Sequence, residues 1–361
     1  MTTNSPQLPL RRGEVIPALH EAKAQAFLTT ALPNVRYLTN FTGSNGALLL
    51  TEDRALLFTD PRYATQAPQE SDCEVKVAKG PLLKEVAKWI KRLQLKSLAF
   101  EQNRISFEDY GQLKEHAKNL RLKPLNGLVE TLRAVKSEAE IAAIRNSVQL
   151  NSTALEQSLR HFKPSMTEID LAAEIDYRMR RLGAEGPAFE TIVASGKRSA
   201  LPHARPTEAR IQTDELLLID MGAIVAGYAS DMTRAHAVGK LDTKRQRMYR
   251  AVLESQLAAL EAIKPGVTCA NVDRVARDVL RGFGLDKLFV HSTGHGLGLE
   301  IHERPRVGRK DKTKLVTGMV ITVEPGVYEE GFGGVRIEDT VVVTASGCEV
   351  LTPTKKELLT L

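Results

Sequence analysis

The sequence has few cysteines and no long apolar run. Its 361 residues include only three cysteines, Cys73, Cys269 and Cys348. Such sparse thiols exclude a small disulfide-stapled scaffold and are typical of a reducing compartment. No run of about 18 apolar residues occurs, so we expect no membrane span, and the N-terminus lacks the apolar segment of a secretory signal. We therefore expect a cytoplasmic protein that does not bind membranes.

A strong excess of charge of one sign is also missing. Lysine and arginine number 50 against 44 aspartates and glutamates, which gives a net charge of +6. No dense basic block accompanies this excess, so the charges indicate an ordinary solvated surface, and we expect no nucleic-acid partner. Hydrophobic residues make up 42% of the chain, which excludes global disorder. The length predicts two domains.

The first part of the chain, from about residue 11 to 128, mixes strand-like and helical patterns. Apolar runs at residues 47–50 and 55–58 flank a polar turn, which predicts a β-hairpin. Residues 82–95 carry apolar side chains at helical spacing, which predicts a helix. These patterns indicate an α/β domain, and we find no chemical motif within it.

A boundary is indicated near residues 136–140, where Ser137 and Glu140 form the capping-box pattern that opens a helix. Thr167 is the expected cap of a second helix. Further helices are predicted over residues 245–263 and 269–283, and strands over residues 216–224, 229–238, 319–323 and 335–343. Because helices and strands are grouped rather than alternating, we predict an α+β fold with an antiparallel sheet.

Two aspartates stand in or beside apolar strand-like segments. Asp220 ends the apolar run 216–219, and Asp231 follows eleven residues later. A short hairpin would place the two side chains on neighbouring rungs of adjacent strands. Either aspartate alone is more often a turn or salt-bridge residue, and Arg234 offers a partner. Two adjacent carboxylates, however, repel each other unless they share a proton or a cation.

Three imidazoles gather in one short segment. His291, His295 and His302 lie within twelve residues, with glycines at positions 294, 296 and 298. Glycine lets a backbone approach a ligand or a neighbouring strand closely, but this spacing is not the dinucleotide-binding fingerprint. A lone histidine is usually structural, whereas a cluster of three favours a functional site.

Two glutamates complete the set. Glu324 ends the predicted strand 319–323, and Glu338 shares a strand face with Arg336, a pattern that in isolation most often forms an ion pair. Together, two aspartates, two glutamates and one imidazole form a ligand set. Four ionised carboxylates in one pocket need compensation, and two divalent cations would supply it. Such oxygen-rich donors suit Mn²⁺, and Zn²⁺ or Co²⁺ less exclusively.

The order of these five residues resembles that of the pita-bread dinuclear metallopeptidases, which include methionine aminopeptidase, aminopeptidase P and prolidase. The motifs that carry the resemblance are Ser-Thr-Gly-His-Gly-Leu-Gly, Val-Glu-Pro-Gly and Val-Arg-Ile-Glu-Asp, at residues 292–298, 323–326 and 335–339. Residues 34–44 and 58–63 resemble the creatinase/prolidase-type N-terminal domain, which methionine aminopeptidases lack. The resemblance implies a creatinase-type α/β domain over residues 1–132 and a pita-bread catalytic domain over residues 133–361.

The resemblance also implies roles for individual residues. The implied ligands of two divalent ions are Asp220, Asp231, His295, Glu324 and Glu338. Among the implied catalytic residues, His203 lies on the substrate side, His291 and His302 steady the tetrahedral intermediate, Glu324 shuttles a proton, and Arg336 orients the ligands. Tyr228 and Tyr328 either line the pocket or belong to the core.

The implied activity is hydrolysis of the bond between an N-terminal residue and a following proline by a metal-bridging hydroxide. A proline-containing peptide is then the substrate, and a homodimer is the expected assembly. Aminopeptidase and dipeptidase specificity both stay open. Two further alternatives are a non-catalytic binding or scaffold protein and a creatinase-like amidinohydrolase. The intact set of four mutually repelling carboxylates disfavours both.

Overall fold

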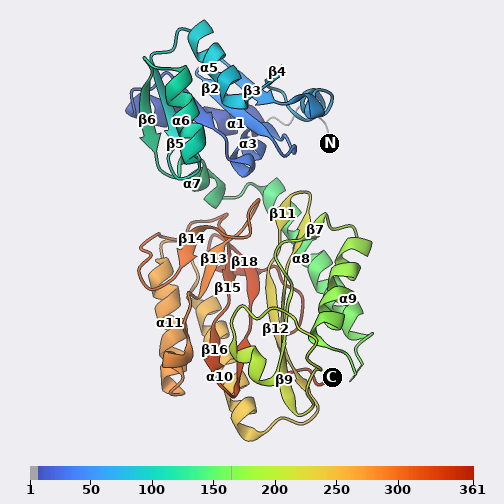
Figure 1. Cartoon of the computed structure of the whole chain (residues 1–361). Helices are drawn as coiled ribbons and strands as arrows, with labels where there is room; N and C mark the ends of the chain where they lie inside the picture. Colours follow the sequence, from blue (N-terminus) through green and yellow to red (C-terminus); the bar gives the residue numbers. More distant parts are fainter. Residues whose placement is uncertain (1–6, 164) are drawn as a thin grey trace. The chain divides into compact units, whose positions relative to one another are not determined.

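The computed structural model describes residues 7–163 and 165–361 (Figure 1). The chain divides into two compact units, of which the first ends at Arg133 and the second runs from Ala134 to Leu361. Within the described ranges, no helix combines the length and the apolar character that crossing a membrane requires.

The first unit is built on a six-stranded mixed sheet with the strand order β4-β3-β2-β1-β5-β6. Its strands are β1 (Ala26–Thr29), β2 (Gly46–Thr51), β3 (Ala55–Thr59), β4 (Glu74–Val77), β5 (Ser97–Glu101) and β6 (Arg121–Leu125). Its helices are α1 (Gln7–Gly13), α2 (Ile16–Glu21), α3 (Leu32–Thr39), α4 (Gln66–Glu70), α5 (Leu82–Arg92), α6 (Phe107–His116) and α7 (Leu128–Ala134), with the 3₁₀ turn η1 (Pro61–Tyr63).

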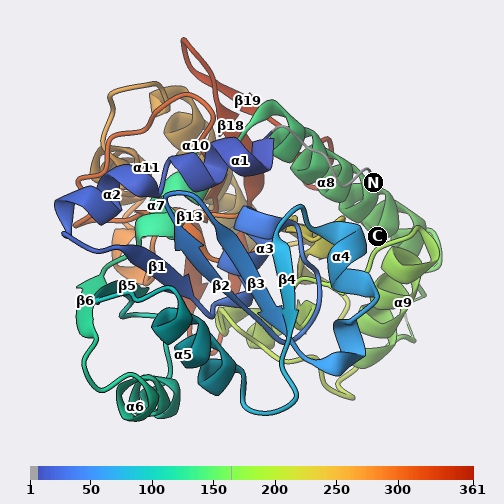
Figure 2. The ribbon, with the colours of Figure 1, turned by 90° about the horizontal axis from the view of Figure 1, so that it is seen from above.

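Alternation along β3 assigns the helices of this unit to the two faces of its sheet. Leu56 and Phe58 belong to one apolar cluster with Leu83 of α5, whereas Leu57 packs with Val35 of α3. Figure 2 shows β1 to β4 side by side. The predicted hairpin is confirmed, because β2 and β3 pair antiparallel. The predicted helix 82–95 ends earlier, at Arg92.

The described part of the second unit contains four long helices, thirteen strands and two 3₁₀ turns. The helices are α8 (Glu138–Leu159), α9 (Glu168–Arg181), α10 (Thr243–Ala262) and α11 (Cys269–Gly282), and the turns are η2 (Gly196–Ala200) and η3 (Asp286–Leu288). The strands are β7 (Gly186–Pro187), β8 (Ile192–Ser195), β9 (Glu215–Met221), β10 (Ala223–Val225), β11 (Tyr228–Ala229), β12 (Met232–Val238), β13 (Gly294–Gly296), β14 (Glu303–Val307), β15 (Val320–Val323), β16 (Gly326–Glu329), β17 (Gly333–Arg336), β18 (Asp339–Val343) and β19 (Cys348–Val350).

The strands of this unit lie between two pairs of helices (Figure 1). The sheets have the orders β12-β9-β8, β14-β13-β15-β18-β19, β11-β10-β7 and β16-β17. Every pairing between these strands is antiparallel, which confirms the α+β prediction. One apolar core joins α8 and α9 to β8, β9 and β12, and the other joins α10 and α11 to β15 and β18.

The predicted helix starts are confirmed by their caps. Ser137 and Glu140 form both hydrogen bonds of a capping box at the start of α8. Thr167 forms the equivalent pair with Asp170 at the start of α9. These side chains satisfy backbone N–H groups that have no partner within the helix.

Three of the predicted strands are interrupted, each close to one of the candidate ligand residues. The segment 216–224 divides into β9 and β10, the segment 229–238 into β11 and β12, and the segment 335–343 into β17 and β18, and in each case the two strands join different sheets. The break in 335–343 arises because the backbone N–H groups of Ile337 and Glu338 bond to the carbonyl oxygens of Pro325 and Thr233, at 3.4 and 3.1 Å. Glu338 is therefore held at a junction between sheets.

Candidate metal centre

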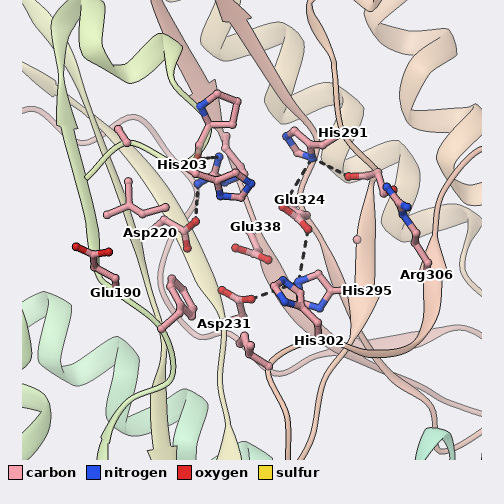
Figure 3. Close-up of a pocket in the computed structure, with 18 of the residues that line it drawn as sticks. Glu190, His203, Asp220, Asp231, His291, His295, His302, Arg306, Glu324 and Glu338 are labelled. Atoms are coloured by element: carbon pink, nitrogen blue, oxygen red, sulfur yellow. Dashed lines mark hydrogen bonds and ion pairs between the residues drawn. The ribbon is translucent and has the colours of Figure 1, made fainter. Parts of the chain in front are cut away.

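A cavity of about 670 Å³ lies in the second unit (Figure 3). Polar side chains from several strand ends and loops line it, together with apolar residues such as Phe189, Ile192 and Pro202. All nine residues that the sequence singled out line this cavity: His203, Asp220, Asp231, His291, His295, His302, Glu324, Arg336 and Glu338.

The strand register explains why the two aspartates meet. Asp220, near the end of β9, is paired with Thr233 of β12. Asp231 directly precedes β12 and lies two residues from Thr233, so the two side chains share a face. Asp220 and Asp231 are thus diagonal neighbours, close to the arrangement that the sequence predicted.

The backbone around His295 is held against β15 by a close approach that only glycine permits. A Cβ atom on Gly294 would lie 1.9 Å from the carbonyl oxygen of Thr322. The backbone N–H of His295 donates to the Oγ1 atom of Thr322 at 3.2 Å. Because Glu324 follows directly after β15, this contact fixes His295 beside Glu324.

His295 presents one nitrogen to the carboxylates. Its Nδ1 atom lies 3.0 Å from the carbonyl oxygen of Gly296, so Nδ1 carries the proton of the neutral ring and Nε2 keeps a lone pair. Nε2 lies 3.5 Å from Oδ2 of Asp231 and 3.6 Å from Oε1 of Glu324. One donor atom from each of Asp231, His295 and Glu338 fits within a span of 4.8 Å.

Two buried carboxylate oxygens at this site have no hydrogen-bond partner among the described residues: Oδ1 of Asp220 and Oε1 of Glu338. Such oxygens are costly to bury without compensation. Burial, followed by repulsion from Asp220, raises the pKa of Asp231, and burial, followed by repulsion from Asp231, raises the pKa of Glu338. A divalent cation would use these lone pairs and offset the repulsion, so the residues fit a metal.

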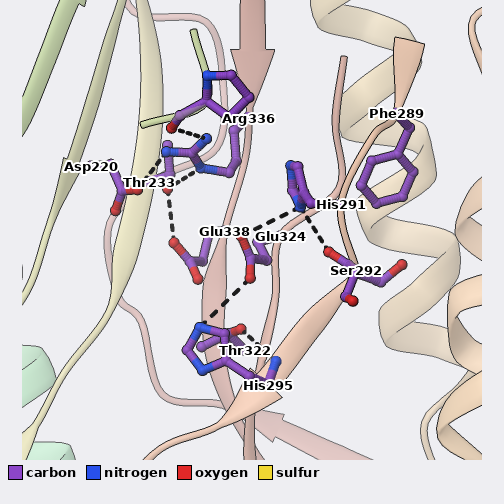
Figure 4. Close-up of polar contacts among 12 residues, drawn as sticks. Asp220, Thr233, Phe289, His291, Ser292, His295, Thr322, Glu324, Arg336 and Glu338 are labelled. Atoms are coloured by element: carbon purple, nitrogen blue, oxygen red, sulfur yellow. Dashed lines mark hydrogen bonds and ion pairs between the residues drawn. The ribbon is translucent and has the colours of Figure 1, made fainter. Parts of the chain in front are cut away.

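Arg336 and Thr233 hold the two partly unpartnered carboxylates in place (Figure 4). The guanidinium of Arg336 contacts Oδ2 of Asp220 through Nη2 and donates to Oγ1 of Thr233 from Nε at 3.0 Å. The hydroxyl of Thr233 in turn donates to Oε2 of Glu338 at 2.8 Å. Our sequence reasoning missed Thr233, although strand alternation from Asp231 would have placed it on the same face.

His291 is bonded to the protein through both ring nitrogens. Nδ1 lies 2.8 Å from the carbonyl oxygen of Ser292, and Nε2 lies 2.8 Å from Oη of Tyr328. Nδ1 therefore donates, and Nε2 accepts from the Tyr328 hydroxyl, which itself accepts from Nη1 of Arg336 at 2.6 Å. Burial, with the charge of Arg336, lowers the pKa of His291 to about 4, and burial raises the pKa of Tyr328 to about 12.

The other two imidazoles flank the carboxylate cluster (Figure 3). The ring of His302 lies edge-on to that of His295, with 4.4 Å between centroids. Burial, and then the neighbouring His295, lowers the pKa of His302. His203 follows η2 and lies near Asp220 (Figure 3). Tyr228 belongs to the core instead, since its hydroxyl donates to Oε1 of Glu140 at 3.0 Å.

Several cavity-lining residues were not foreseen. Phe189, Glu190, Glu303 and Arg306 all line the cavity. In Figure 3, Glu190 and Arg306 lie on opposite sides of the carboxylate cluster. Phe189 and Glu190 come from a loop, where no periodic pattern marks the direction of a side chain. Only the tertiary structure brings them to the wall.

Comparisons with known proteins identify families for both parts of the chain. Residues 142–345 match Metallopeptidase family M24, and residues 11–135 match the Creatinase/Prolidase N-terminal domain. A curated relative, an Xaa-Pro dipeptidase of Pyrococcus horikoshii, is 37% identical over 348 residues, covering 96% of this chain and 97% of that protein.

Solved structures extend the similarity to the fold. An Xaa-Pro dipeptidase from Bacillus anthracis has a TM-score of 0.95 at 40% identity and covers 98% of this chain and 100% of that one. An X-Pro aminopeptidase from Thermotoga maritima has a TM-score of 0.89 at 36% identity, covering 96% and 100%. The second unit therefore has the pita-bread fold, preceded by a creatinase-type N-terminal domain, and the chain belongs to metallopeptidase family M24.

Proposed function

We propose that this protein is a metal-dependent peptidase that hydrolyses the bond between an N-terminal residue and a following proline. The observation that carries the proposal is the convergence of four carboxylates and one imidazole on a single cavity, with two buried carboxylate oxygens left without a partner among the described residues. Xaa-Pro dipeptidases and an X-Pro aminopeptidase among the similar proteins support the same substrate class.

Five residues would hold two divalent cations in this proposal. They are the residues singled out from the sequence: Asp220, Asp231, His295, Glu324 and Glu338. Mn²⁺ is the proposed metal because oxygen donors dominate the set, with Zn²⁺ or Co²⁺ as the alternatives. When bound, such ions lower the pKa of a coordinated water and polarise the carbonyl of the scissile bond.

The chain's own groups supply positioning and proton transfer. Burial raises the pKa of Glu324, so its carboxylate is suited to take a proton from the attacking water and to pass it to the departing proline nitrogen. His302 and His203 border the carboxylate cluster and would donate hydrogen bonds to the developing oxyanion. His291 has both nitrogens engaged by the protein, so we assign it to holding Tyr328 and Arg336.

The cavity also suits a proline ring. Phe189, Ile192 and Pro202 give one part of its wall an apolar character. The Xaa–Pro bond is a tertiary amide without an N–H group, so the enzyme cannot bind its substrate through a hydrogen bond from the scissile amide. Apolar contact with the ring and access to the carbonyl are sufficient.

The test is hydrolysis of Gly-Pro and of Xaa-Pro-Xaa tripeptides by purified protein with added Mn²⁺, Zn²⁺ or Co²⁺, alongside metal analysis. We expect about two ions per chain and loss of activity in Asp231→Asn and Glu338→Gln. Full activity in a chelated preparation would refute the proposal. Comparing the two substrate lengths decides between dipeptidase and aminopeptidase specificity.

Assembly and location are part of the proposal. We propose a homodimer, which light scattering would test, with a monomer as the refuting result. We propose a cytoplasmic location because all three cysteines are free thiols, as a reducing compartment requires. Fractionation of cells would test the location.

A further inference from the structure

A buried ion pair lies at the wall of the cavity, outside the candidate ligand set. The Nζ atom of Lys136 lies 3.2 Å from Oε2 of Glu303, and the side chains are only 1% and 5% exposed. Glu303 lines the cavity, whereas Lys136 precedes the cap of α8. The backbone N–H of Lys136 donates to the carbonyl oxygen of Gly318 at 2.9 Å. The backbone that carries the Lys136 side chain is therefore anchored by this hydrogen bond.

The carboxylate of Glu303 supports the loop that carries His302. This loop, residues 297–302, joins β13 to β14, and the pairing register shifts where it begins. Oε1 of Glu303 accepts the backbone N–H of Glu300 at 3.1 Å. A Cβ atom on Gly298 would lie 2.8 Å from the same oxygen. The loop thus packs directly against the carboxylate, and a side chain at Gly298 would have to displace it.

We propose that Lys136 is a positioning residue that acts through Glu303 to hold His302 at the cavity wall. The inference rests on the proposed peptidase function, because it assigns His302 a place beside the reacting carbonyl. His302 belongs to no regular strand, so its position depends on the loop. The loop depends on Glu303, and the charge of Glu303 is compensated by Lys136.

The energetics predict how the pair responds to substitution. Removing one partner of a buried ion pair leaves the other charge uncompensated and is strongly destabilising, whereas removing both charges is often close to neutral. Lys136→Met removes one positive charge from beside the Glu303 carboxylate, which favours protonation of that carboxylate or its movement away from Glu300. Glu303→Gln keeps a side-chain oxygen that accepts the Glu300 N–H. The combined variant therefore keeps a hydrogen bond to the Glu300 N–H but carries neither the Lys136 nor the Glu303 charge.

The kinetic test compares Lys136→Met, Lys136→Arg, Glu303→Gln and the combined Lys136→Met/Glu303→Gln protein on Gly-Pro at saturating Mn²⁺. We expect Lys136→Met to lower kcat by about 10- to 100-fold, the usual effect of a displaced group in an active site, with KM within about twofold and bound metal unchanged. Lys136→Arg and the combined variant should recover most of kcat. A wild-type kcat in Lys136→Met, or additive losses in the combined variant, would overturn the inference.

The matched control is Arg245→Met. It removes another partly buried ion pair of this unit, in which Nε of Arg245 lies 2.7 Å from Oε2 of Glu215, and neither residue lines the cavity. This variant should keep the wild-type kcat even if its unfolding temperature falls. A loss of kcat equal to that of Lys136→Met would show that lost stability alone causes the effect, and would overturn the inference.

A second measurement does not depend on the substrate. The His302 ring signal in the nuclear magnetic resonance spectrum of the Zn²⁺-loaded protein, assigned with His302→Asn, should shift or broaden in Lys136→Met but not in Arg245→Met. An unchanged signal would overturn the inference. A wild-type protein that cannot cleave Xaa-Pro peptides would instead refute the proposed function, and the spectrum would still test the positioning of His302.

Discussion

The hydroxyl of Thr233, together with Arg336, connects Asp220 and Glu338, the two carboxylates that each keep one oxygen without a partner among the described residues. Thr233 is fully buried, accepts from Arg336 and donates to Glu338. A hydroxyl has only one proton to donate. Because Thr233 donates this proton to Glu338, its hydroxyl oxygen can only accept from Arg336. Such supporting hydrogen bonds orient ligands before a metal arrives. At the residue scale, therefore, the site depends on more than its five candidate ligands.

We expect Thr233→Val to weaken Mn²⁺ binding by about 10- to 100-fold, the usual effect of losing a group that supports a ligand. Valine keeps the shape but leaves Arg336 and Glu338 without their shared partner. Titration calorimetry of the chelated protein measures the change. Thr233→Ser retains the hydroxyl and should bind nearly as tightly as the wild type. Equal affinity in the valine variant would contradict the assigned role.

His236 is a second buried group with an unusual environment. It lies on β12, and neither ring nitrogen has a hydrogen-bond partner among the described residues. Burial, and then the charge of Arg234, lowers its pKa from 6.5 to about 4. The folded state thus keeps His236 neutral at a pH where the unfolded chain binds a proton.

Neutral His236 therefore contributes to the free energy of unfolding in a pH-dependent way. Its contribution, about 3 kcal/mol in total, is complete above pH 6.5, decreases as the pH falls, and is lost below about pH 4. Urea unfolding of the chelated protein at pH 7.5 and pH 5 should show about 2 kcal/mol of this loss in the wild type relative to His236→Phe. Identical pH dependence in both proteins would contradict the prediction.

At the scale of elements, the contact between β13 and β15 positions the imidazole of His295. Gly296 of β13 is paired with Ile321 of β15, and Gly294 lies directly against the Thr322 carbonyl. The two strands therefore approach each other more closely than side chains would allow. The glycines around His295 are part of the geometry of the metal centre.

Gly294→Ala should push β13 away from β15 and displace His295. We expect bound metal to fall below half of the wild-type content, since a buried Cβ cannot fit 1.9 Å from a carbonyl oxygen. Metal analysis after dialysis measures the loss. Gly347→Ala is the control, because its Cβ would lie 3.8 Å from the nearest atom, the carbonyl oxygen of Ile263. Full metal content in Gly294→Ala would refute the explanation.

Local patterns predicted the elements better than their interruptions. The capping boxes at Ser137 and Thr167 and the hairpin of β2 and β3 follow from short-range chemistry, which a sequence displays directly. The break between β17 and β18 depends on hydrogen bonds from residues 337 and 338 to Pro325 and Thr233, which are distant in sequence or in another sheet. The motifs around His295 and Glu324 suggested a shared cavity, and strand alternation from Asp231 would also have reached Thr233. The contact between Lys136 and Glu303, in contrast, joins residues 167 positions apart that no local pattern connects.

For the whole molecule, metal binding depends on where the charged residues lie rather than on the net charge. The chain carries +6 overall, yet four candidate ligand carboxylates lie in one cavity of the second unit. The first unit contributes none of the candidate ligands, which all fall between residues 220 and 338. Metal binding should therefore stabilise the two units unequally.

Scanning calorimetry of the chelated protein should show that added Mn²⁺ raises the unfolding temperature of one transition and leaves another in place. A ligand that binds only a folded state stabilises that state, and here the ligand set is confined to residues 134–361. The chelated Asp231→Asn protein should show no such shift. A single transition that moves as a whole would contradict independent stabilisation.

Two of the five candidate ligands lie in β9 and β13, and the other three lie directly beside the ends of β12, β15 and β18. This distribution has a consequence for how the protein folds. Among the described residues, no single hairpin brings all five together, because they come from sheets whose strands are distant in sequence. Pairing of segments so far apart in sequence is slow, because the entropy of closing the intervening loops is lost before the contacts reward it. We therefore expect a complete ligand set only in the assembled second unit, so that metal loading depends on the folding of that unit.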